Sequence, residues 1–481
     1  MHIKKTGLLL SLILISASLT LADWQSFQLT DNSYAESMSS VDLDPSDIPH
    51  FAWCSNNDGD YDIYYLSEIT GTPVKVTDNN TNDLYPRLRI DQAGNAHIAF
   101  KGHDGHDYEE FYVNNIGGSF CDPVQVSFTE TDVGVFVPEH SCLSIDPAGV
   151  AHIAYKYGYY EYGNWDIYYV NNEGGSFGSS TRVTDETGGK SYVRPSMALD
   201  SNSFVHTVFE NGANILYTNN VAGTFDSLTT VSAGTICWHS SIGIDSSDNV
   251  HVSYSKYHGG AYYINNVGGS FETTVTLTTA NSINEVTALV VDHLDNIHVA
   301  YIGGDFGTPN THELYYVNNC TGSFEVPEQL TFNSEHTANI SLSIDSVCAG
   351  HIAFLEGLYG SNDYEVWYCT NSEFVGISSD NASYSGSSPS TFSLQNHPNP
   401  FNPTTTISYQ LSVNANITLS IYNILGQKLR TLVNENKPAG YHSVLWNGTD
   451  ENSQPVPSGV YFYQLTTGSD ISETKRMMFL K

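Results

Sequence analysis

An Asp followed six residues later by a His recurs seven times along this chain. The pairs are Asp44 with His50, Asp91 with His97, Asp146 with His152, Asp200 with His206, Asp245 with His251, Asp292 with His298, and Asp345 with His351. The surrounding sequence repeats as well, most clearly in LRIDQAGNAHIAF at residues 88–100 and LSIDPAGVAHIAY at residues 143–155. Self-similar units that return every fifty residues or so (~50) are typical of propellers and other repeat folds. The repeat therefore predicts one structural unit built seven times.

Each unit divides into four extended segments when apolar alternation and turn residues are followed. In the second unit these are residues 86–91, 97–101, 109–114 and 123–127. Four antiparallel strands joined by short hairpins make one propeller blade. No unit contains a helix-length run of helical periodicity, which excludes a helical solenoid; a β-helix with shorter, parallel rungs remains a weaker alternative. The predicted fold is all-β, with a seven-bladed β-propeller of four-stranded blades over residues 23–379.

The ends of the repeat region predict how the ring closes. Residues 24–30 (WQSFQLT) align with the fourth-strand segments at residues 74–77 and 328–331. After the seventh third strand, at residues 365–370, only a weak fourth-strand candidate follows. We therefore expect the N-terminal segment to complete the last blade and to cover an edge that would otherwise be exposed.

The Asp and His of each pair end the first strand and begin the second, so they face each other across a hairpin mouth. A carboxylate there can accept turn N–H groups and an imidazole N–H, which fixes the turn and the His tautomer. The alternative is that one pair acts as a general base, or that several gather a metal. Because a single site needs one set of residues and these copies are spread around a ring, we interpret all fourteen as structural.

The first 22 residues have the features of a secretory signal peptide. Lys4 and Lys5 precede an apolar run that begins at Gly7, and small residues lead to Ala22. No later segment approaches the roughly eighteen consecutive apolar residues that a bilayer-spanning helix needs. We expect an exported protein without a transmembrane helix.

The charge of the chain is concentrated in the repeat region. Of 17 Lys and Arg, two lie in the first 22 residues and six after Ser390, whereas only five of 52 Asp and Glu follow Ser390. Nine basic and 47 acidic residues remain between, a net charge near −38. Phosphate backbones would be repelled, which excludes nucleic acid as a partner. An acidic solubilising surface and cation binding at particular loops are both compatible with this charge.

Function is expected at the end of the blades where the second-to-third loops and the interblade connections lie, because these segments vary most. The aromatic loop YGYYEYGNW at residues 157–165 is the main candidate for ligand binding, together with an aromatic residue on an interblade connection. The candidate residues are Tyr157, Tyr159, Tyr160, Tyr162, Trp165 and Trp238. Exposed aromatic platforms suit sugars or peptides. The alternative is that the loop packs over the ring mouth.

Two further loops have the composition of metal sites. Asp58, Asp60 and Asp62 alternate in NNDGDYD, which is similar to the oxygen-rich spacing of calcium loops, so calcium is the candidate cofactor. His103 and His106 in HDGHD offer two imidazoles for a transition metal. The alternatives are an ordinary Asp/Asn/Gly turn and a solvated loop.

The remaining motifs argue against a recognisable enzyme. The repeat region contains Arg87, Arg89, Arg182 and Arg194 without the S-x-D-x-G-x-T-W boxes of propeller sialidases, and it has no G-x-S-x-G or H-E-x-x-H motif. The seven cysteines show no metal-type C-x-x-C spacing and do not recur at equivalent positions. One or two disulfides are compatible with an exported protein, and at least one thiol is expected to stay free or to pair elsewhere.

A Ser-, Asn- and Gly-rich linker at residues 380–391 leads to a second domain at residues 392–481. This domain contains LQNHPNPFNPTTTI, IYNILGQ, PSGVYFYQL and KRMMFLK in order. The run resembles the C-terminal sorting domain of bacterial type IX secretion cargo and the Ig-like domain of flagellar hook-capping proteins. Its alternating segments predict a small β-sandwich. The resemblance implies export by the type IX machinery to the cell surface or beyond; an ordinary Ig-like module that stays on the protein is the alternative.

The repeats also resemble the broad class of secreted bacterial β-propellers, which host many functions. We therefore predict a secreted or surface-displayed propeller that binds an extracellular glycan, protein or surface polymer and is not an enzyme. The alternatives are an extracellular hydrolase or lyase acting on polysaccharide, and a structural component of the cell envelope.

Overall fold

Strands make up all the regular secondary structure in the described part of the computed structural model. The described residues are 24–31, 34–69, 71–128, 141–159, 164–184, 191–232, 236–256, 259–271, 273–278, 283–304, 312–332, 335–358, 364–372, 393–397, 405–411, 415–423, 426–437, 440–451, 454–467 and 472–479. The predicted signal peptide and the predicted linker lie outside these residues. No helix in the described ranges is long and apolar enough to cross a bilayer.

Seven four-stranded antiparallel sheets form the blades, and the first six pair their strands in chain order. Blades one to three are β2 (Glu36–Leu43), β3 (Pro49–Ser55), β4 (Asp62–Leu66) and β5 (Val74–Lys75); β6 (Leu84–Ile90), β7 (Ala96–His103), β8 (Tyr108–Asn114) and β9 (Val124–Gln125); β10 (Ser141–Ile145), β11 (Ala151–Tyr159), β12 (Asn164–Asn171) and β13 (Thr181–Arg182). Blades four to six are β14 (Val193–Leu199), β15 (Val205–Glu210), β16 (Ile215–Asn219) and β17 (Thr229–Ser232); β18 (Cys237–Ile244), β19 (Val250–Lys256), β20 (Gly260–Asn265) and β21 (Val275–Thr276); β22 (Ile283–Val291), β23 (Ile297–Gly304), β24 (Glu313–Asn318) and β25 (Glu328–Gln329).

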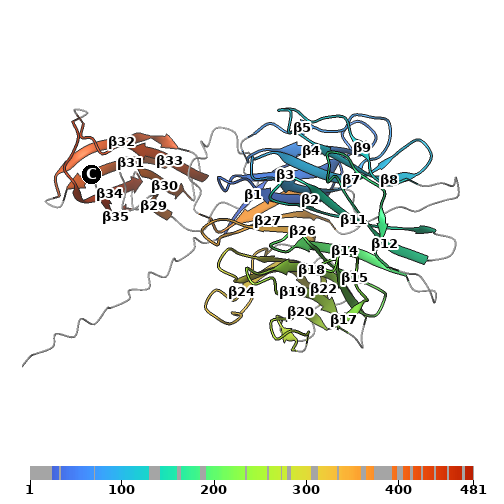
Figure 1. Cartoon of the computed structure of the whole chain (residues 1–481). Coiled ribbons are helices and arrows are strands. Elements are labelled where there is room, and N and C mark those ends of the chain that lie inside the picture. Colours follow the sequence, from blue (N-terminus) through green and yellow to red (C-terminus); the bar gives the residue numbers. More distant parts are fainter. Residues whose placement is uncertain are drawn as a thin grey trace, which may run out of the picture.

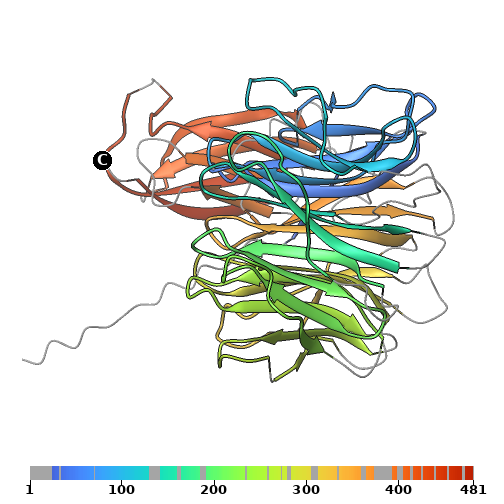
Figure 2. The same cartoon turned by 45° about the vertical axis from the view of Figure 1, so that its right-hand side comes forward.

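The seventh blade joins the two ends of the repeat region. It contains β26 (His336–Ile344), β27 (Gly350–Gly357), β28 (Glu365–Thr370) and β1 (Gln25–Gln28). β1 pairs with β28 from Gln25 opposite Thr370 to Gln28 opposite Trp367, which is the pairing expected from the sequence. The first strand of each blade contacts those of its neighbours, and β26 contacts β2. Figures 1 and 2 show the gold β26 and β27 beside the blue strands of the first blade, so the ring is closed.

In five blades, a Ser or Thr just after the fourth strand donates a hydrogen bond from its hydroxyl to a carboxylate near the start of the third strand. The five pairs are Thr77–Asp62, Ser127–Glu109, Thr184–Asp166, Thr331–Glu313 and Thr30–Glu365. In the seventh blade the hydroxyl of Thr30 also accepts the backbone N–H of Val366. The N-terminal segment therefore makes the same contact as an ordinary fourth strand.

Each Asp/His pair is part of a three-residue clamp at the first-to-second hairpin. The Asp Oδ1 accepts two turn N–H groups, two and four residues further on, in every blade. The His Nε2 lies 3.0 to 3.9 Å from the Asp Oδ2. The His Nδ1 lies 2.5 to 2.7 Å from a Tyr hydroxyl on the third strand. The clamp thus links the first three strands of each blade.

In the seventh blade, the clamp includes a Tyr and a Ser partner that were not predicted from the sequence. Nε2 of His351 lies 3.2 Å from Oδ2 of Asp345, and Nδ1 of His351 lies 2.5 Å from the hydroxyl of Tyr368. Ser372 adds a fourth partner, because its hydroxyl donates to Oδ2 of Asp345 at 2.7 Å. The hairpin mouth does not leave the imidazole in solvent, since His351, like the other six clamp histidines, is buried. The expected Asp/His pair is therefore an interior Asp–His–Tyr group, while its purely structural role stays a prediction.

The second strands carry the cores between blades. In the second blade, Ile98 and Phe100 pack with Val113 and with Ile63 of the first blade, and all four are buried. The Ala between them, Ala99, faces the third blade instead. Alternate residues of one strand thus fill two interblade cores, as the pleat of a strand covered on both faces requires.

The C-terminal residues form an Ig-like β-sandwich. One sheet contains β29 (Ser393–His397), β30 (Thr405–Leu411) and β33 (Gly440–Trp446), and the other contains β32 (Lys428–Lys437), β31 (Ala415–Asn423), β34 (Gly459–Thr467) and β35 (Ser472–Phe479). Trp446 is fully buried and packs against Tyr461 and Phe479. Alternating apolar residues of the facing sheets, such as Ile417, supply the rest of this core.

None of the seven cysteines forms a disulfide in the structure. The one or two disulfides that the sequence allowed are therefore not formed. Cys54, Cys237 and Cys369 are buried in interblade cores, where they pack as small apolar side chains.

Candidate functional site

A cavity of about 770 Å³ lies on the axis of the propeller. The first strand of every blade contributes to its wall, and so do the ends of β19, β23 and β27. Tyr364, just before β28, completes the wall. The ends of the second strands and Tyr364 belong to the end of the blades where function was expected, and from there the cavity extends along the first strands as far as Arg89, opposite His97.

Small residues explain why the axis is hollow. Six blades carry Ser40, Cys142, Ser196, Ser241, Ala288 or Ser341 at one equivalent first-strand position. Several of these serines accept a backbone N–H from the next blade, as Ser40 does from Leu88 at 3.1 Å and Ser241 from Leu289 at 3.0 Å. The blades are therefore joined near the axis without bulky side chains.

The second blade departs from this pattern, because it carries Arg87 at the equivalent position. Arg87 lies opposite Ala99 on the second strand, as Ser40 lies opposite Ala52 in the first blade. Its Nε donates to the carbonyl of Ser141 in the third blade at 3.1 Å, and the side chain lines the cavity. Burial lowers the pKa of this guanidinium, but arginine stays protonated in proteins. Arg87 thus places a positive charge where the other blades leave space.

Glu110 is a second departure of the same blade. The equivalent third-strand residues are buried and apolar, namely Ile63, Ile167, Ile215, Ala261, Leu314 and Val366. Glu110 is fully buried, and no hydrogen bond of ordinary geometry reaches its carboxylate oxygens. Burial raises its pKa to about 8, against the opposing charges of Arg87 and Lys101. A carboxyl group that titrates near neutral pH therefore lies behind the cavity wall.

Arg194 and His239 share a buried carboxylate in the fourth blade. Arg194 Nη1 lies 3.0 Å from Oε2 of Glu210, and the backbone N–H of His239 donates to Oε1 of the same residue. Burial raises the pKa of Glu210 to about 7, although Arg194 opposes the shift. This carboxylate joins the fourth and fifth blades directly behind two residues of the cavity wall.

A β-bulge aims several of these side chains at the axis. Most first strands shift register near their start, and five residues there have positive φ: Met38, Tyr85, Arg194, His239 and Asn339. Each stands six residues before the clamp Asp of its blade. All but Tyr85 line the cavity. Bulges redirect side chains, and left-handed non-glycine residues cluster at functional sites.

The cavity wall is positively charged although the propeller is strongly acidic. Four of the nine basic residues between positions 23 and 390, Arg87, Arg89, Arg194 and Lys256, line it. Glu36 is the acidic residue of the wall, and the hydroxyl of Ser55 donates to its carboxylate. The arrangement places cations around one cavity, where the low-dielectric surroundings strengthen their attraction for a ligand anion.

Aromatic and imidazole groups accompany these cations. Trp238 stacks on His239 with ring planes 7° apart, and both line the cavity. The hydroxyl of Tyr364 lies 3.0 Å from Nδ1 of His336, whose Nε2 lies 3.1 Å from Nδ1 of His312. Both imidazoles are buried. A chain of proton-carrying groups therefore reaches the cavity from the start of the third strand of the sixth blade, by way of His336 of the seventh.

The predicted aromatic site is only partly brought together. Trp238 lines the cavity. Tyr157 packs edge-on against Tyr168, and the Trp165 ring lies under Nζ of Lys156 at 4.4 Å, so neither joins the described cavity wall. The side chain of Tyr159, and Tyr160 and Tyr162 entirely, lie outside the described residues.

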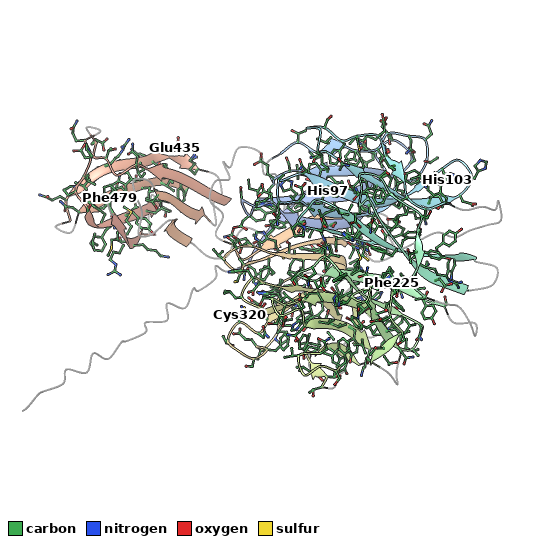
Figure 3. All side chains as sticks on the ribbon, viewed as in Figure 1. His97, His103, Phe225, Cys320, Glu435 and Phe479 are labelled. Atoms are coloured by element: carbon green, nitrogen blue, oxygen red, sulfur yellow. The ribbon has the colours of Figure 1, made fainter. Side chains whose placement is uncertain are left out.

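The predicted metal loops are also described in part. Nζ of Lys75 lies 2.6 Å from Asp58, 2.9 Å from Asp62 and 2.5 Å from Asp78, so an ammonium group already occupies the centre of these carboxylates. Asp60 is not among its partners. His103 Nδ1 accepts the N–H of Gly105, and the exposed His106 does not join it in a ligand cluster among the described residues. Figure 3 shows His103 at the outer edge of the propeller.

The fourteen Asp and His residues of the repeat are absent from the described cavity wall. In the first blade, for example, His50 lies 2.5 Å from the hydroxyl of Tyr65, and in the last His351 contacts Asp345 and Tyr368. These partners all belong to the same blade as the imidazole. The clamps therefore stand apart from the candidate site.

Several residues that give the cavity its character were not predicted from the sequence, above all Arg87, Glu110, Glu210 and His336. A signal was present, because aligning the seven units shows where one blade carries a charge and the others a small or apolar residue. The strand registers make that alignment unambiguous.

Comparison with known sequence families gives a match in the C-terminal domain. Residues 399–470 match the FlgD Ig-like domain family. A search of curated protein sequences found no match.

Solved structures resemble the propeller at low identity. An oligogalacturonate lyase in complex with manganese has a TM-score of 0.49 at 11% identity, over 73% of this chain and 93% of that one. An oligogalacturonate lyase from Vibrio parahaemolyticus has a TM-score of 0.47 at 10% identity, over 73% and 97%. An α-L-arabinofuranosidase from Fusarium graminearum has a TM-score of 0.45 at 10% identity, over 60% and 92%. Likeness at this level concerns the fold alone.

Proposed function

We propose that the propeller binds an acidic extracellular glycan in its central cavity. The observation that carries the proposal is the placement of Arg87, Arg89, Arg194 and Lys256 around one cavity in a region of net charge near −38. Cations distributed only to balance surface charge would lie beside the acidic residues of the outer strands, as Lys75 and Arg182 do.

The chemistry of the wall suits a carboxylated sugar. A guanidinium presents a planar fork of donors that matches a carboxylate, and its positive charge strengthens those hydrogen bonds. Trp238 offers an aromatic face for the apolar side of a sugar ring. The serines of the wall can hydrogen-bond sugar hydroxyls. The volume of about 770 Å³ lies within the range of small-ligand sites.

A second candidate function is an enzyme that acts on the same class of polysaccharide. The observation in its favour is the chain from His312 through His336 to Tyr364, which ends at the cavity. General acid–base catalysis needs a group that can exchange a proton near the operating pH. In this case Tyr364 would contact the substrate, and His336 would position its hydroxyl and accept its proton.

The binding proposal is tested by calorimetric titration of residues 23–481 with a uronate trisaccharide and with the neutral trisaccharide made by reducing its carboxylates. We expect saturable binding of the acidic sugar alone. Arg89→Gln and Lys256→Gln should each weaken it about tenfold, a loss of about 1.4 kcal/mol. These two are chosen because Arg87 and Arg194 also join neighbouring blades.

Arg182→Gln is the matched control, because this guanidinium pairs with Asp166 at the outer edge of the third blade. Equal affinity for both sugars, or an equal loss in the control, would remove the basis of the proposal. Release of shortened or unsaturated sugars by the wild type, abolished in Tyr364→Phe with binding retained, would establish the enzymatic alternative instead.

We also propose that the C-terminal Ig-like domain directs export, with the type IX machinery as its partner and the cell surface or medium as destination. The sequence resemblance and the signal peptide features support this proposal. Its test is deletion of residues 392–481 in a host with that machinery. Retention of the propeller inside the outer membrane is expected, and continued export past that membrane would overturn the proposal.

A further inference from the structure

The clamp of the sixth blade has chemistry that the other clamps lack. His298 Nε2 lies 3.0 Å from Oδ2 of Asp292 and 3.8 Å from Sγ of Cys320. Ligand atoms of these three residues all lie within 4.8 Å of one another. Asp292 and His298 are fully buried at their side chains, whereas Cys320 is exposed on the turn after β24. Figure 3 shows Cys320 on the opposite side of the propeller from His103, away from the variable loops.

A second thiol reaches the same place from the seventh blade. Cys348, on the turn between β26 and β27, interacts with the carboxylate of Asp292 through its side chain. Its Sγ also lies 4.0 Å from Nδ1 of His293. Two thiols, two imidazoles and one carboxylate, from three turns and strand β23, therefore lie near one another where two blades meet.

The repeat explains why Cys348 points to the sixth blade. At the equivalent turn position, Asp248, Asp295 and Asp47 each accept hydrogen bonds from a Ser of the preceding blade. The side chain at this position thus crosses from one blade to the one before it. In the seventh blade a Cys stands in place of that Asp, and in the sixth His293 stands in place of that Ser.

Cys320 is likewise a departure from the repeat. The equivalent turn residues in the second to fifth blades are Ile116, Glu173, Val221 and Val267. In the sixth blade, a thiol takes the place of these apolar or charged side chains, and it is directed at the imidazole of His298. Two independent replacements, Cys320 in the sixth blade and Cys348 in the seventh, thus bring thiol groups close to Asp292.

We propose that Cys320, Cys348, His298 and Asp292 form a binding site for a zinc-type divalent metal ion that joins the sixth and seventh blades. Thiolate and imidazole ligands select such ions, and four ligands close a tetrahedral site. Bond lengths of about 2.3 Å to sulfur and about 2.0 Å to nitrogen set a sulfur-to-nitrogen separation of roughly 3.6 Å in a tetrahedron. The separation of Cys320 Sγ and His298 Nε2 is 3.8 Å. His293 is a further ligand within reach of Cys348.

The surroundings already orient these ligands. The hydroxyl of Tyr316 lies 2.5 Å from Nδ1 of His298, so Nδ1 can carry the proton while Nε2 binds the metal. Oδ1 of Asp292 accepts the backbone N–H groups of Leu294 and Asn296, and Oδ2, which faces His298, also accepts the side-chain amide of Asn296 at 2.9 Å. Such outer contacts are what metal ligands require. On binding, the two thiols release their protons and the imidazole proton moves from Nε2 to Nδ1.

The test is titration of the reduced, metal-free full chain with Co²⁺, which reports thiolate and tetrahedral coordination by its absorption. We expect sulfur-to-cobalt charge-transfer bands together with intense visible bands, both displaced by Zn²⁺. Cys320→Ser and Cys348→Ser should each remove or strongly reduce the charge-transfer bands and weaken binding by 100-fold or more. Cys121→Ser, which alters an exposed cysteine of the second blade, is the matched control and should behave like wild type.

Thermal unfolding keeps the proposal testable if a cysteine variant is less stable. Zn²⁺ should raise the melting temperature of the wild type and the Cys121→Ser chain, and should leave Cys320→Ser and Cys348→Ser unshifted. Bands that survive both substitutions would overturn the proposal. The proposal would also be overturned if Cys320 and Cys348 form a disulfide and the chain does not bind Co²⁺ after that disulfide is reduced.

Discussion

Glu110 occupies a position at which the other six blades carry a buried apolar residue. Its carboxylate lies near two cations, Arg87 and Lys101, but burial still dominates and raises its pKa to about 8. A buried carboxyl group of this kind either serves a function near the cavity or lowers the stability of the fold. At the residue scale, the informative positions are therefore those where one blade breaks the sevenfold rule.

The change Glu110→Gln should make stability less dependent on pH. Because the folded-state pKa is above the unfolded value, the wild type loses stability as pH rises from about 4.5 to about 8. The glutamine cannot ionise, so its advantage should grow across that window at a slope of up to about 1.4 kcal/mol per pH unit. Urea unfolding at several pH values measures this. Glu173→Gln, at an exposed turn, should show no such trend, and a constant difference for Glu110→Gln would contradict the expectation.

At the scale of the element, the Asp–His–Tyr clamp holds three strands of a blade at one end of the hairpin. Burial lowers the pKa of six clamp imidazoles: His50, His97, His152, His206, His251 and His298. They stay neutral in the fold at pH values where the unfolded chain takes up protons. Each of them therefore contributes less to stability as pH falls below about 6.5.

The change His251→Ala should destabilise the propeller without affecting the cavity. It leaves the hydroxyl of Tyr263 and the Oδ2 of Asp245 without their imidazole partner, which should lower the free energy of unfolding by about 2 kcal/mol. Denaturant unfolding measures the loss, and titration with the uronate trisaccharide measures affinity. His251 and its strand partner Gly243 do not line the cavity, so reduced affinity in the folded variant would show that the clamps take part in binding.

At the scale of the whole molecule, the ring depends on one short strand from the other end of the repeat region. β1 pairs with β28, and Thr30 bonds Glu365 and Val366 as a regular fourth strand would. Trp24 additionally packs edge-on against Tyr316 of the sixth blade. The N-terminal segment thus pairs with the seventh blade and also packs against the sixth.

Removal of residues 24–30 should lower the melting temperature of the entire propeller rather than fray one end. The deletion exposes the edge of β28 and part of a shared interblade core, so closure is lost for all blades together. Scanning calorimetry should show one propeller transition shifted down by several degrees, with the transition of the C-terminal domain unchanged. Thr30→Val, which keeps the strand but removes its hydroxyl, should give a smaller shift. A deletion variant with unaltered melting would show that β1 is dispensable.

The number of blades, their four strands, the ring-closing segment and the C-terminal sandwich could all be predicted from the sequence, because hairpins and repeats are local patterns that every copy reinforces. The cavity could not be predicted in the same way. Arg87 and Tyr364 meet the same space only because seven blades return the chain to its starting point. Cys320 and Cys348 both approach Asp292 because a turn side chain crosses between blades. Spacing along the chain carries no record of which side chains face one axis, so the fold had to be closed before those residues could be recognised together.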